Sequence, residues 1–176
     1  MKRLIAVALA VFISSAVQAG PIFLTGHDPD FHAQLTTSAR NLLKSGLGFV
    51  TGGTYTNPVD GGAGSLNLGA GKFLWVESRI GDAGLPSLPG GYFVGESGLG
   101  SIGLTLGTDY DRVNGTEFGA VNLANYSAIA IASTFGGLLR NVELNALNAR
   151  KTDIENFING GGGLLALSQS FQGPQR

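Results

Sequence analysis

Apolar and polar positions form distinct blocks along the last forty-five residues of the chain, from Tyr126 to Ser170. Tyr126–Ser133 is a short run of β-branched and small apolar residues, which is typical of a strand buried on both faces. A helical pattern follows over Asn141–Asn159, and the glycines Gly160–Gly163 lead into a second apolar run, Leu164–Ser168. Two buried strands joined by a helix make a βαβ unit, and such units build parallel sheets. This region therefore predicts an α/β fold.

The N-terminal part of the chain shows the same order of strand and helix. Pro21–Thr25 predicts the first strand, and we expect the next helix to end at Gly46. Either Asp28, which precedes a proline, or Asp30 is suited to cap the start of this helix. The apolar residues at helical spacing in this segment are Leu35, Ala39, Leu42 and Leu43.

The middle of the chain alternates between short apolar runs and glycine-rich tracts. Lys72–Ser78 predicts a strand, and Tyr110–Val113 predicts a shorter one. Gly95–Leu106 reads as a helix weakened by glycine, although its spacing also allows a strand. Glu117–Asn125 favours a turn or a short helix. The tracts expected to be exposed and without regular structure are Gly46–Gly71 and Gly81–Gly91.

The last helical segment carries signals for more than one helix start. Asn141 is a suitable cap with Glu143 in the first turn, and Thr152–Glu155 fits a capping box. The segment is therefore either one helix or two helices with a bend near Lys151. The apolar residues that share its buried face are Leu144, Leu147, Ile154 and Ile158, with Phe157 beside them.

Two stretches, the module Tyr126–Ser170 and Phe23–His32, resemble the class I glutamine amidotransferase-like superfamily, and within it the ThuA-like (trehalose-utilisation) domains. Phe23–His32 (FLTGHDPDFH) is similar to the first strand and loop of those domains. Gly136-Gly137 matches the turn in which the family offers backbone amides to an oxyanion, and Ser168 falls at the family's nucleophile elbow. The resemblance implies a three-layer, flavodoxin-like parallel sheet. It also implies a longer domain, so we expect the strand Leu164–Leu167 to lack its covering elements and the fold to be incomplete at the C-terminus.

Composition and charge narrow the class of protein. The chain has 176 residues, of which 13% are charged and 43% hydrophobic, so it is expected to form one domain with a core. It has no cysteine, which excludes disulfides and thiolate chemistry. The basic start Met1–Arg3, the apolar run Leu4–Val17 and the small residues up to Ala19 predict a signal peptide cleaved before Gly20. We therefore expect secretion, to the periplasm, cell surface or medium of a bacterium, and residues 20–176 as the mature domain.

The charge balance also bears on partners. Without Lys2 and Arg3 the mature chain holds 9 basic and 12 acidic residues, a net charge of −3. No basic cluster interleaved with aromatic residues is present in the sequence, so nucleic acid is not an expected partner. The apolar run of the signal peptide is shorter than the roughly 20 residues of a membrane span. We expect no transmembrane span in the mature chain.

Polar residues follow each predicted strand of the sheet. In open α/β sheets ligands bind at the carboxyl ends of the strands, so these residues should share one rim. Glu77 and Ser78 follow the second strand, and Ser133 follows the strand that ends before Gly136-Gly137. The residues we expect to bind a ligand at this rim are His27, Asp28, Glu77, Ser133, Gly136 and Gly137.

The first loop holds the only two histidines of the chain. Imidazole and carboxylate groups within six residues are suited to a divalent metal or to a hydroxylated ligand, so His27, Asp28 and His32 form a candidate metal site. The alternative is structural, because Asp28 is also a helix cap and His32 a surface residue. No other cofactor is expected.

Ser168 is a candidate nucleophile only through the family resemblance. An active serine needs a base within hydrogen-bond reach, and the sequence has no histidine after Ser168. His27 is the only available substitute, so a polar strand end is the favoured interpretation of Ser168.

These observations predict a secreted, non-catalytic ligand-binding or interaction domain of amidotransferase-like fold. The resemblance to ThuA-like domains suggests sugars or polyols as ligands. The alternative is a hydrolase that uses Ser168, or a metal-assisted site built on His27, Asp28 and Glu77. Self-association through the uncovered sheet is expected in either case.

Overall fold

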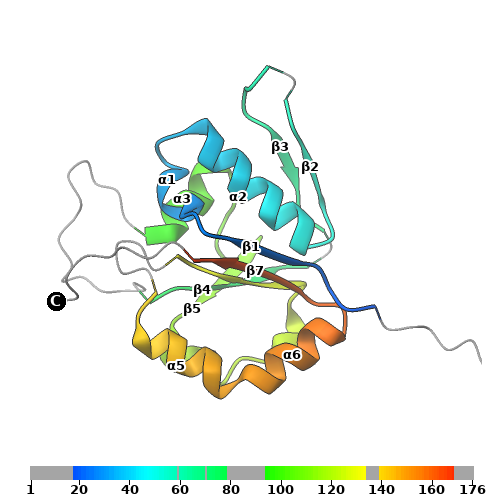
Figure 1. Cartoon of the computed structure of the whole chain (residues 1–176), viewed down its shortest axis with the longest axis vertical. Coiled ribbons are helices and arrows are strands. Elements are labelled where there is room, and N and C mark those ends of the chain that lie inside the picture. Colours follow the sequence, from blue (N-terminus) through cyan, green and yellow to red (C-terminus); the bar gives the residue numbers. More distant parts are fainter. Residues whose placement is uncertain (1–17, 59, 70, 79–93, 134–138, 169–176) are drawn as a thin grey trace, which may run out of the picture.

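A computed structural model describes residues 18–58, 60–69, 71–78, 94–133 and 139–168. Within these residues a five-stranded parallel sheet lies between two layers of helices (Figure 1). The strands are β1 (Ile22–Thr25), β4 (Phe73–Val76), β5 (Tyr110–Val113), β6 (Ala128–Ile131) and β7 (Gly163–Leu167). The helices on one face are α1 (Pro29–His32), α2 (Thr37–Val50) and α3 (Val94–Ser101). The opposite face carries α4 (Gly115–Phe118), the 3-10 helix η1 (Leu123–Asn125), α5 (Asn141–Ala149) and α6 (Lys151–Asn159).

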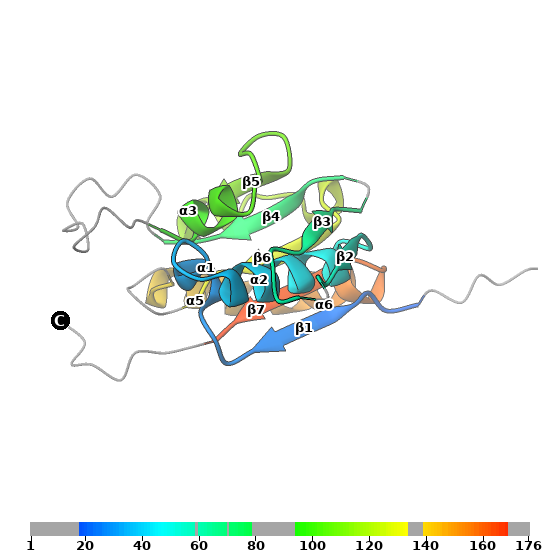
Figure 2. The same ribbon diagram turned by 90° about the horizontal axis from the view of Figure 1, so that it is seen from above.

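The strand order across the sheet is β1-β7-β6-β4-β5, which Figure 2 shows from above. The chain enters at the β1 edge, moves to β4 and β5 with its helices on one face, and returns to β6 and β7 with its helices on the other. Right-handed crossovers require this change of face when the direction of travel reverses. The predicted three-layer α/β fold is confirmed. The strand order differs from the order 2-1-3-4-5 of flavodoxin, because the first strand lies at the edge of this sheet.

The core lies on both faces of the sheet. β4 is central, and all four of its side chains are buried. Phe73 and Trp75 pack with residues of α2 and α3, while Leu74 and Val76 pack with Phe118 on the other face. Because successive side chains of a strand point to opposite faces, one apolar run supplies both halves of the core.

The segment after β1 forms two helices instead of the one that the sequence predicts. Asp28 stands at the N-cap position of α1 but makes no side-chain cap bond, and α2 is capped by Thr36, whose Oγ1 accepts from the Ala39 amide at 3.2 Å. The prediction that Gly46 ends the helix is wrong, since α2 continues to Val50. A Cβ atom on Gly46 would lie 3.0 Å from Leu165 Cδ1, so this glycine allows α2 to approach the sheet closely.

The tract Gly46–Gly71 is not free of regular structure, as the sequence suggested. Besides the end of α2 it contains the antiparallel pair β2 (Thr54–Thr56) and β3 (Ser65–Asn67). Each strand has three residues, too few for a periodic pattern. The tract Gly81–Gly91 lies outside the described residues.

The last helical segment is two helices, as one of the two sequence interpretations had it. The break is at Arg150, where φ is −108° and ψ is 21°. The predicted capping signals are wrong: Asn141 is the first residue of α5 and not its cap, and α6 has no side-chain cap bond. Glu143 lies in the first turn of α5, as predicted, and accepts from the amides of Arg140, the N-cap residue, and Gly115, both at 3.0 Å.

The other predicted elements are confirmed with small shifts of their bounds. They are the strands at Pro21–Thr25, Lys72–Ser78, Tyr110–Val113, Tyr126–Ser133 and Leu164–Ser168, the helical interpretation of Gly95–Leu106, and the short helices within Glu117–Asn125.

The expectation that the last strand is uncovered is wrong. β7 is paired with β1 on one side and β6 on the other, and Leu165 and Leu167 are buried. The open edge of this side of the sheet belongs to β1, where Ile22 is 49% and Leu24 69% exposed. Strand edges of this kind are available for pairing with another chain.

The described chain begins close to the start of the predicted mature domain. The Gly20 amide donates to the Ile158 carbonyl, at 2.7 Å, near the C-terminal end of α6. A Cβ atom on Gly20 would lie 2.0 Å from the Gly162 carbonyl oxygen, so only glycine fits here without a shift of backbone. Most of the predicted signal peptide lies outside the described residues. Among the helices that the structure describes, none has the length and apolar character that crossing a membrane requires.

Candidate functional site

The strand ends that the sequence assigned to one rim do lie at one end of the sheet, because all five strands are parallel. β4 and β6 are neighbours, and the chain leaves them toward opposite faces. Such a switch point is where ligands bind in open α/β sheets. Glu77 follows β4 at this point and Ser133 lies two residues beyond β6.

Asp30 joins α1 to the end of β6. Its side chain is fully buried, and Oδ2 accepts from the Ser133 amide at 2.8 Å. The other oxygen, Oδ1, and the Ser133 hydroxyl have no hydrogen-bond partner of normal geometry among the described residues. Burial raises the pKa of Asp30 from 3.8 to about 6, against the lowering effect of the Ser133 amide and hydroxyl, which lie close by. The negative charge of Asp28 adds to the rise.

Asp28 is the buried acid of a separate surface groove. It is 3% exposed, and its Oδ2 lies 3.5 Å from His32 Nε2, an ion-pair approach but not a hydrogen bond. We call the cavity beside it the α1–α2 groove. It has a volume of about 380 Å³ and is lined by His27, Asp28, Pro29, His32, Thr36, Ser38, Ala39 and Leu42. The groove combines one carboxylate, two imidazoles, two hydroxyls and apolar carbon surface.

His27 stands at the mouth of the first loop. It is exposed, and its Nδ1 lies 3.1 Å from Thr25 Oγ1, which also accepts from the His27 amide at 3.2 Å. Which ring nitrogen carries the proton depends on the tautomer. The contact with Thr25 leaves Nε2 as the nitrogen available to a ligand.

Glu77 is fully buried, and its carboxylate is hydrogen-bonded within the core. Its Oε2 accepts from Trp75 Nε1 at 2.6 Å and from the Glu96 amide at 3.2 Å. The carboxylate thus holds the central strand to the first turn of α3. Glu77 does not line the α1–α2 groove. Ser78, next to it, is half-buried.

Ser168 directly follows β7 and has an exposed side chain. Its Oγ donates to the Thr25 carbonyl at 3.0 Å, which ties it to the neighbouring edge strand. Thr25 therefore lies between Ser168 and His27. Gly136 and Gly137, predicted to supply oxyanion amides, lie outside the described residues.

The candidate metal residues come together only in part. His32 and Asp28 face each other, while His27 is directed at Thr25. Within the described ranges, no group of three or more histidine, cysteine, aspartate or glutamate residues is arranged to hold a metal ion. A divalent metal at this loop stays a prediction.

The structure thus divides the predicted rim. His27, Asp28 and His32 line one groove, Ser133 is bonded to Asp30, and Glu77 is bonded within the core. The sequence predicts Asp30 only as a possible helix cap. A second acid two residues after Asp28, flanked by Pro29 and Phe31, was the available signal, since a carboxylate between apolar neighbours is a candidate for burial.

Comparison of the chain with protein-family models, with curated proteins and with solved structures found no match. The resemblance to amidotransferase-like domains therefore stays a prediction that rests on the sequence stretches quoted above.

Proposed function

We propose that this protein binds a sugar or another polyol in the α1–α2 groove and does not act on it chemically. The observation that carries the proposal is Asp28, a buried carboxylate that lines the groove and whose Oδ2, 3.5 Å from His32 Nε2, has no hydrogen-bond partner among the residues that the structure describes. Buried acceptors of this kind normally have a partner. Ligand hydroxyl groups are donors that a carboxylate binds strongly.

The rest of the groove fits the same class of ligand. Thr36, Ser38 and the two imidazoles offer both donors and acceptors to hydroxyl groups. Pro29, Ala39 and Leu42 offer carbon surface to the C–H face of a sugar ring. The volume of about 380 Å³ lies in the range of small-molecule sites.

The contacts of the polar strand ends support binding without catalysis. A serine nucleophile passes its proton to a base, whereas Ser168 donates to the Thr25 carbonyl. Glu77, a residue of the proposed metal-assisted alternative, already accepts two hydrogen bonds in the core. Labelling of Ser168 by a fluorophosphonate, lost in Ser168→Ala, would instead establish the hydrolase alternative.

Calorimetric titration of the protein with glucose, trehalose and sorbitol tests the proposal. We expect saturable binding of at least one of these, and an increase in Kd of about tenfold or more in Asp28→Asn, because a charged acceptor is lost. Asn keeps the size of the side chain. His32→Gln should weaken binding in the same direction.

The matched control is Glu155→Gln, which removes an exposed carboxylate of α6, whose ion pair with Lys151 spans 3.7 Å. This variant should bind as the unchanged protein does. Heat released by none of the three polyols, or equal affinity in Asp28→Asn, would refute the proposal.

Two further features of the protein belong to this proposal. Export is proposed from the pattern of Met1–Ala19, and N-terminal mass spectrometry of the exported protein should find Gly20 or a residue within a few positions. Self-association is proposed for the β1 edge, where Leu24 is exposed and no strand of the described residues pairs with the outer side of β1. Leu24→Lys should then lower the sedimentation-average mass, and Val142→Lys, a change of an exposed residue on α5, should not.

A further inference from the structure

The α1–α2 groove holds a negative charge and no lysine or arginine. Asp28 is the only acid among its lining residues, and the only side chains there that can become positive are the two imidazoles. A second buried carboxylate, Asp30, lies two residues further along the chain, in α1. Burial raises the pKa of Asp30, and the negative charge of Asp28 adds to the rise, so the two acids act on each other. The groove therefore borders on a pair of buried acids.

Neither acid is paired with a lysine or an arginine among the residues that the structure describes. The ion-pair contact of Asp28 is with His32, whose Nε2 lies 3.5 Å from Oδ2, and imidazoles of ordinary pKa are mostly uncharged at neutral pH. Arg40 of α2 donates instead to the carbonyls of Ala33 and Gln34, at 2.7 and 3.2 Å. Buried carboxylates normally have a cation beside them. A positive charge is therefore missing beside Asp28.

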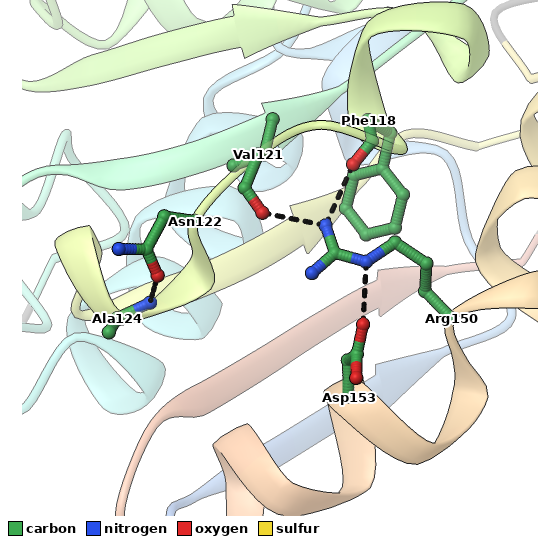
Figure 3. Close-up of polar contacts among 6 residues, drawn as sticks. All are labelled: Phe118, Val121, Asn122, Ala124, Arg150 and Asp153. Carbon is green, nitrogen blue, oxygen red and sulfur yellow. Dashed lines mark hydrogen bonds and ion pairs between the residues drawn. The ribbon is translucent and has the colours of Figure 1, made fainter.

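Asp153, which lines a cavity at the opposite end of the sheet, shows the usual arrangement. Its Oδ2 accepts from Arg150 Nε at 2.9 Å, although its side chain is 57% exposed. Figure 3 shows Arg150 between this acid and the carbonyls of Phe118 and Val121, to which Nη1 donates at 2.8 and 2.7 Å. That cavity, of about 750 Å³, thus has both its acid and its arginine bonded already. Of these two cavities, the α1–α2 groove alone has an acid that lacks a cation.

Hydroxyl and ammonium groups differ as donors to such a carboxylate. A hydroxyl group donates to Asp28 but leaves its negative charge in place, whereas a primary ammonium group donates and also supplies the missing positive charge. Asp28 is only 3% exposed, so water and salt screen this attraction less than they would at the surface. A metal ion fits less well, because only Asp28 and His32 of the candidate metal residues are in contact, and divalent metals prefer more than two ligands.

We infer that the ligand of the α1–α2 groove is an amino polyol, a sugar or sugar alcohol with a primary ammonium group, and that this group binds the Asp28 carboxylate. The inference rests on the proposed function and narrows its class of ligand. The hydroxyl groups of Thr36 and Ser38 and the carbon surface of Leu42 bind the rest of the ligand, as they would a neutral polyol. The positive charge is the feature by which the groove selects among polyols.

Calorimetric titration of the full-length protein with matched pairs of ligands tests this inference. Glucose, trehalose and sorbitol are each compared with the counterpart in which an amino group replaces one primary hydroxyl. At about pH 7.5 such an alkylamine is protonated, whereas imidazoles of ordinary pKa are mostly uncharged. We expect the amino counterpart of at least one polyol to bind about tenfold or more tightly than the polyol itself. The N-acetylated amine, which has no charge, should bind no more tightly than the polyol.

The variant Asp28→Asn tests where the ammonium group binds. It removes the charge and keeps the size of the side chain, so the polyol and its amino counterpart should bind it about equally. Because both affinities are measured on the same variant, a general loss of affinity does not disturb their ratio. Asp60→Asn makes the same chemical change at an exposed residue and should keep the preference. In the unchanged protein the preference should also fall as the salt concentration rises, because salt screens the attraction between the charges.

The outcomes separate this inference from the proposed function. Equal affinity of the unchanged protein for each polyol and its amino counterpart would overturn the inference and leave the proposed function intact. A preference that persists in Asp28→Asn would overturn the inference as well, because the ammonium group would then bind elsewhere. If neither the polyols nor their amino counterparts bind, the proposed function itself is refuted, and the inference with it.

Discussion

Asp30 shows how a single buried carboxyl group makes the stability of this fold depend on pH. One of its oxygens is bonded to the Ser133 amide, and the other has no partner among the described residues. Burial favours the neutral acid, which raises the pKa of Asp30 to about 6. At neutral pH the folded protein therefore carries an ionised group in the core, and near pH 4 it carries a neutral one.

We expect the free energy of unfolding to fall as pH rises from 4 to 7. The folded state binds the Asp30 proton more tightly than the unfolded chain does. This stabilisation is therefore complete below pH 3.8 and is lost as the pH rises through about 6. The difference between the two pKa values corresponds to about 3 kcal/mol. Asp30→Asn should remove this contribution, while Asp60→Asn, a change at an exposed residue, should keep it.

Urea denaturation at several pH values measures this effect as the difference between the variants and the unchanged protein. A difference between the Asp30→Asn and unchanged proteins that does not vary with pH would show that Asp30 has an ordinary pKa in the fold.

The residues of the site could be predicted where they are close in sequence, and not where the fold brings them together. His27, Asp28 and His32 lie within six residues, and all three line the α1–α2 groove. The partner of Asp30, by contrast, is 103 residues away, and Glu77 is bonded to a residue 19 positions further on. Propensity at Asp28 and Asp30 indicated helix caps. Asp28 stands at the N-cap position of α1 but makes no side-chain cap bond, and the Asp30 side chain binds the distant Ser133 amide instead.

Several glycines of this protein lie where two backbone segments pack closely together, and not only in turns. Gly98 lies inside α3, and a Cβ there would be 2.0 Å from the Asp30 carbonyl oxygen of α1. Gly100, two residues later in the same helix, has nothing within 4 Å of its Cβ position. The two positions therefore separate the helix propensity of glycine from its role in packing.

We expect Gly98→Ala to destabilise the protein and Gly100→Ala to leave it equal or more stable by up to about 1 kcal/mol. Alanine favours the helix at both positions, but at Gly98 it must push α1 away from α3. Thermal unfolding of the two variants measures the contrast. Similar midpoints for both would mean that α1 is not held against α3 in solution. Gly98→Ala should also weaken binding in the α1–α2 groove, because α1 carries Pro29 and His32.

The elements could be predicted wherever an apolar run is long enough to show its period. All five strands of the parallel sheet and the paired helices of the last segment belong to this class. β2 and β3 were missed because three residues carry no periodic signal, and the end of α2 was misplaced because Gly46 is a contact to Leu165 rather than a stop.

The arrangement of the whole molecule was the least predictable part. Local patterns indicate that β1 is a strand, but not that it lies at the edge beside the last strand of the described chain. This position depends on contacts between segments more than a hundred residues apart. It also explains why the last strand is covered, contrary to the expectation from family resemblance, since β1 supplies its missing neighbour.

If the proposed leader is removed before Gly20, the position of this residue links folding to maturation. Removal of a leader before Gly20 would turn the amide on the Ile158 carbonyl into a charged ammonium group at the C-terminal end of α6. A positive charge there stabilises a helix by about 0.3–1 kcal/mol. The folded state would thus become more stable only once the leader is gone, which favours folding after export over folding before it. Protein that starts at Gly20 should unfold at a higher temperature with a free N-terminal amine than with an acetylated one. Equal unfolding midpoints would show that the ammonium group does not stabilise α6.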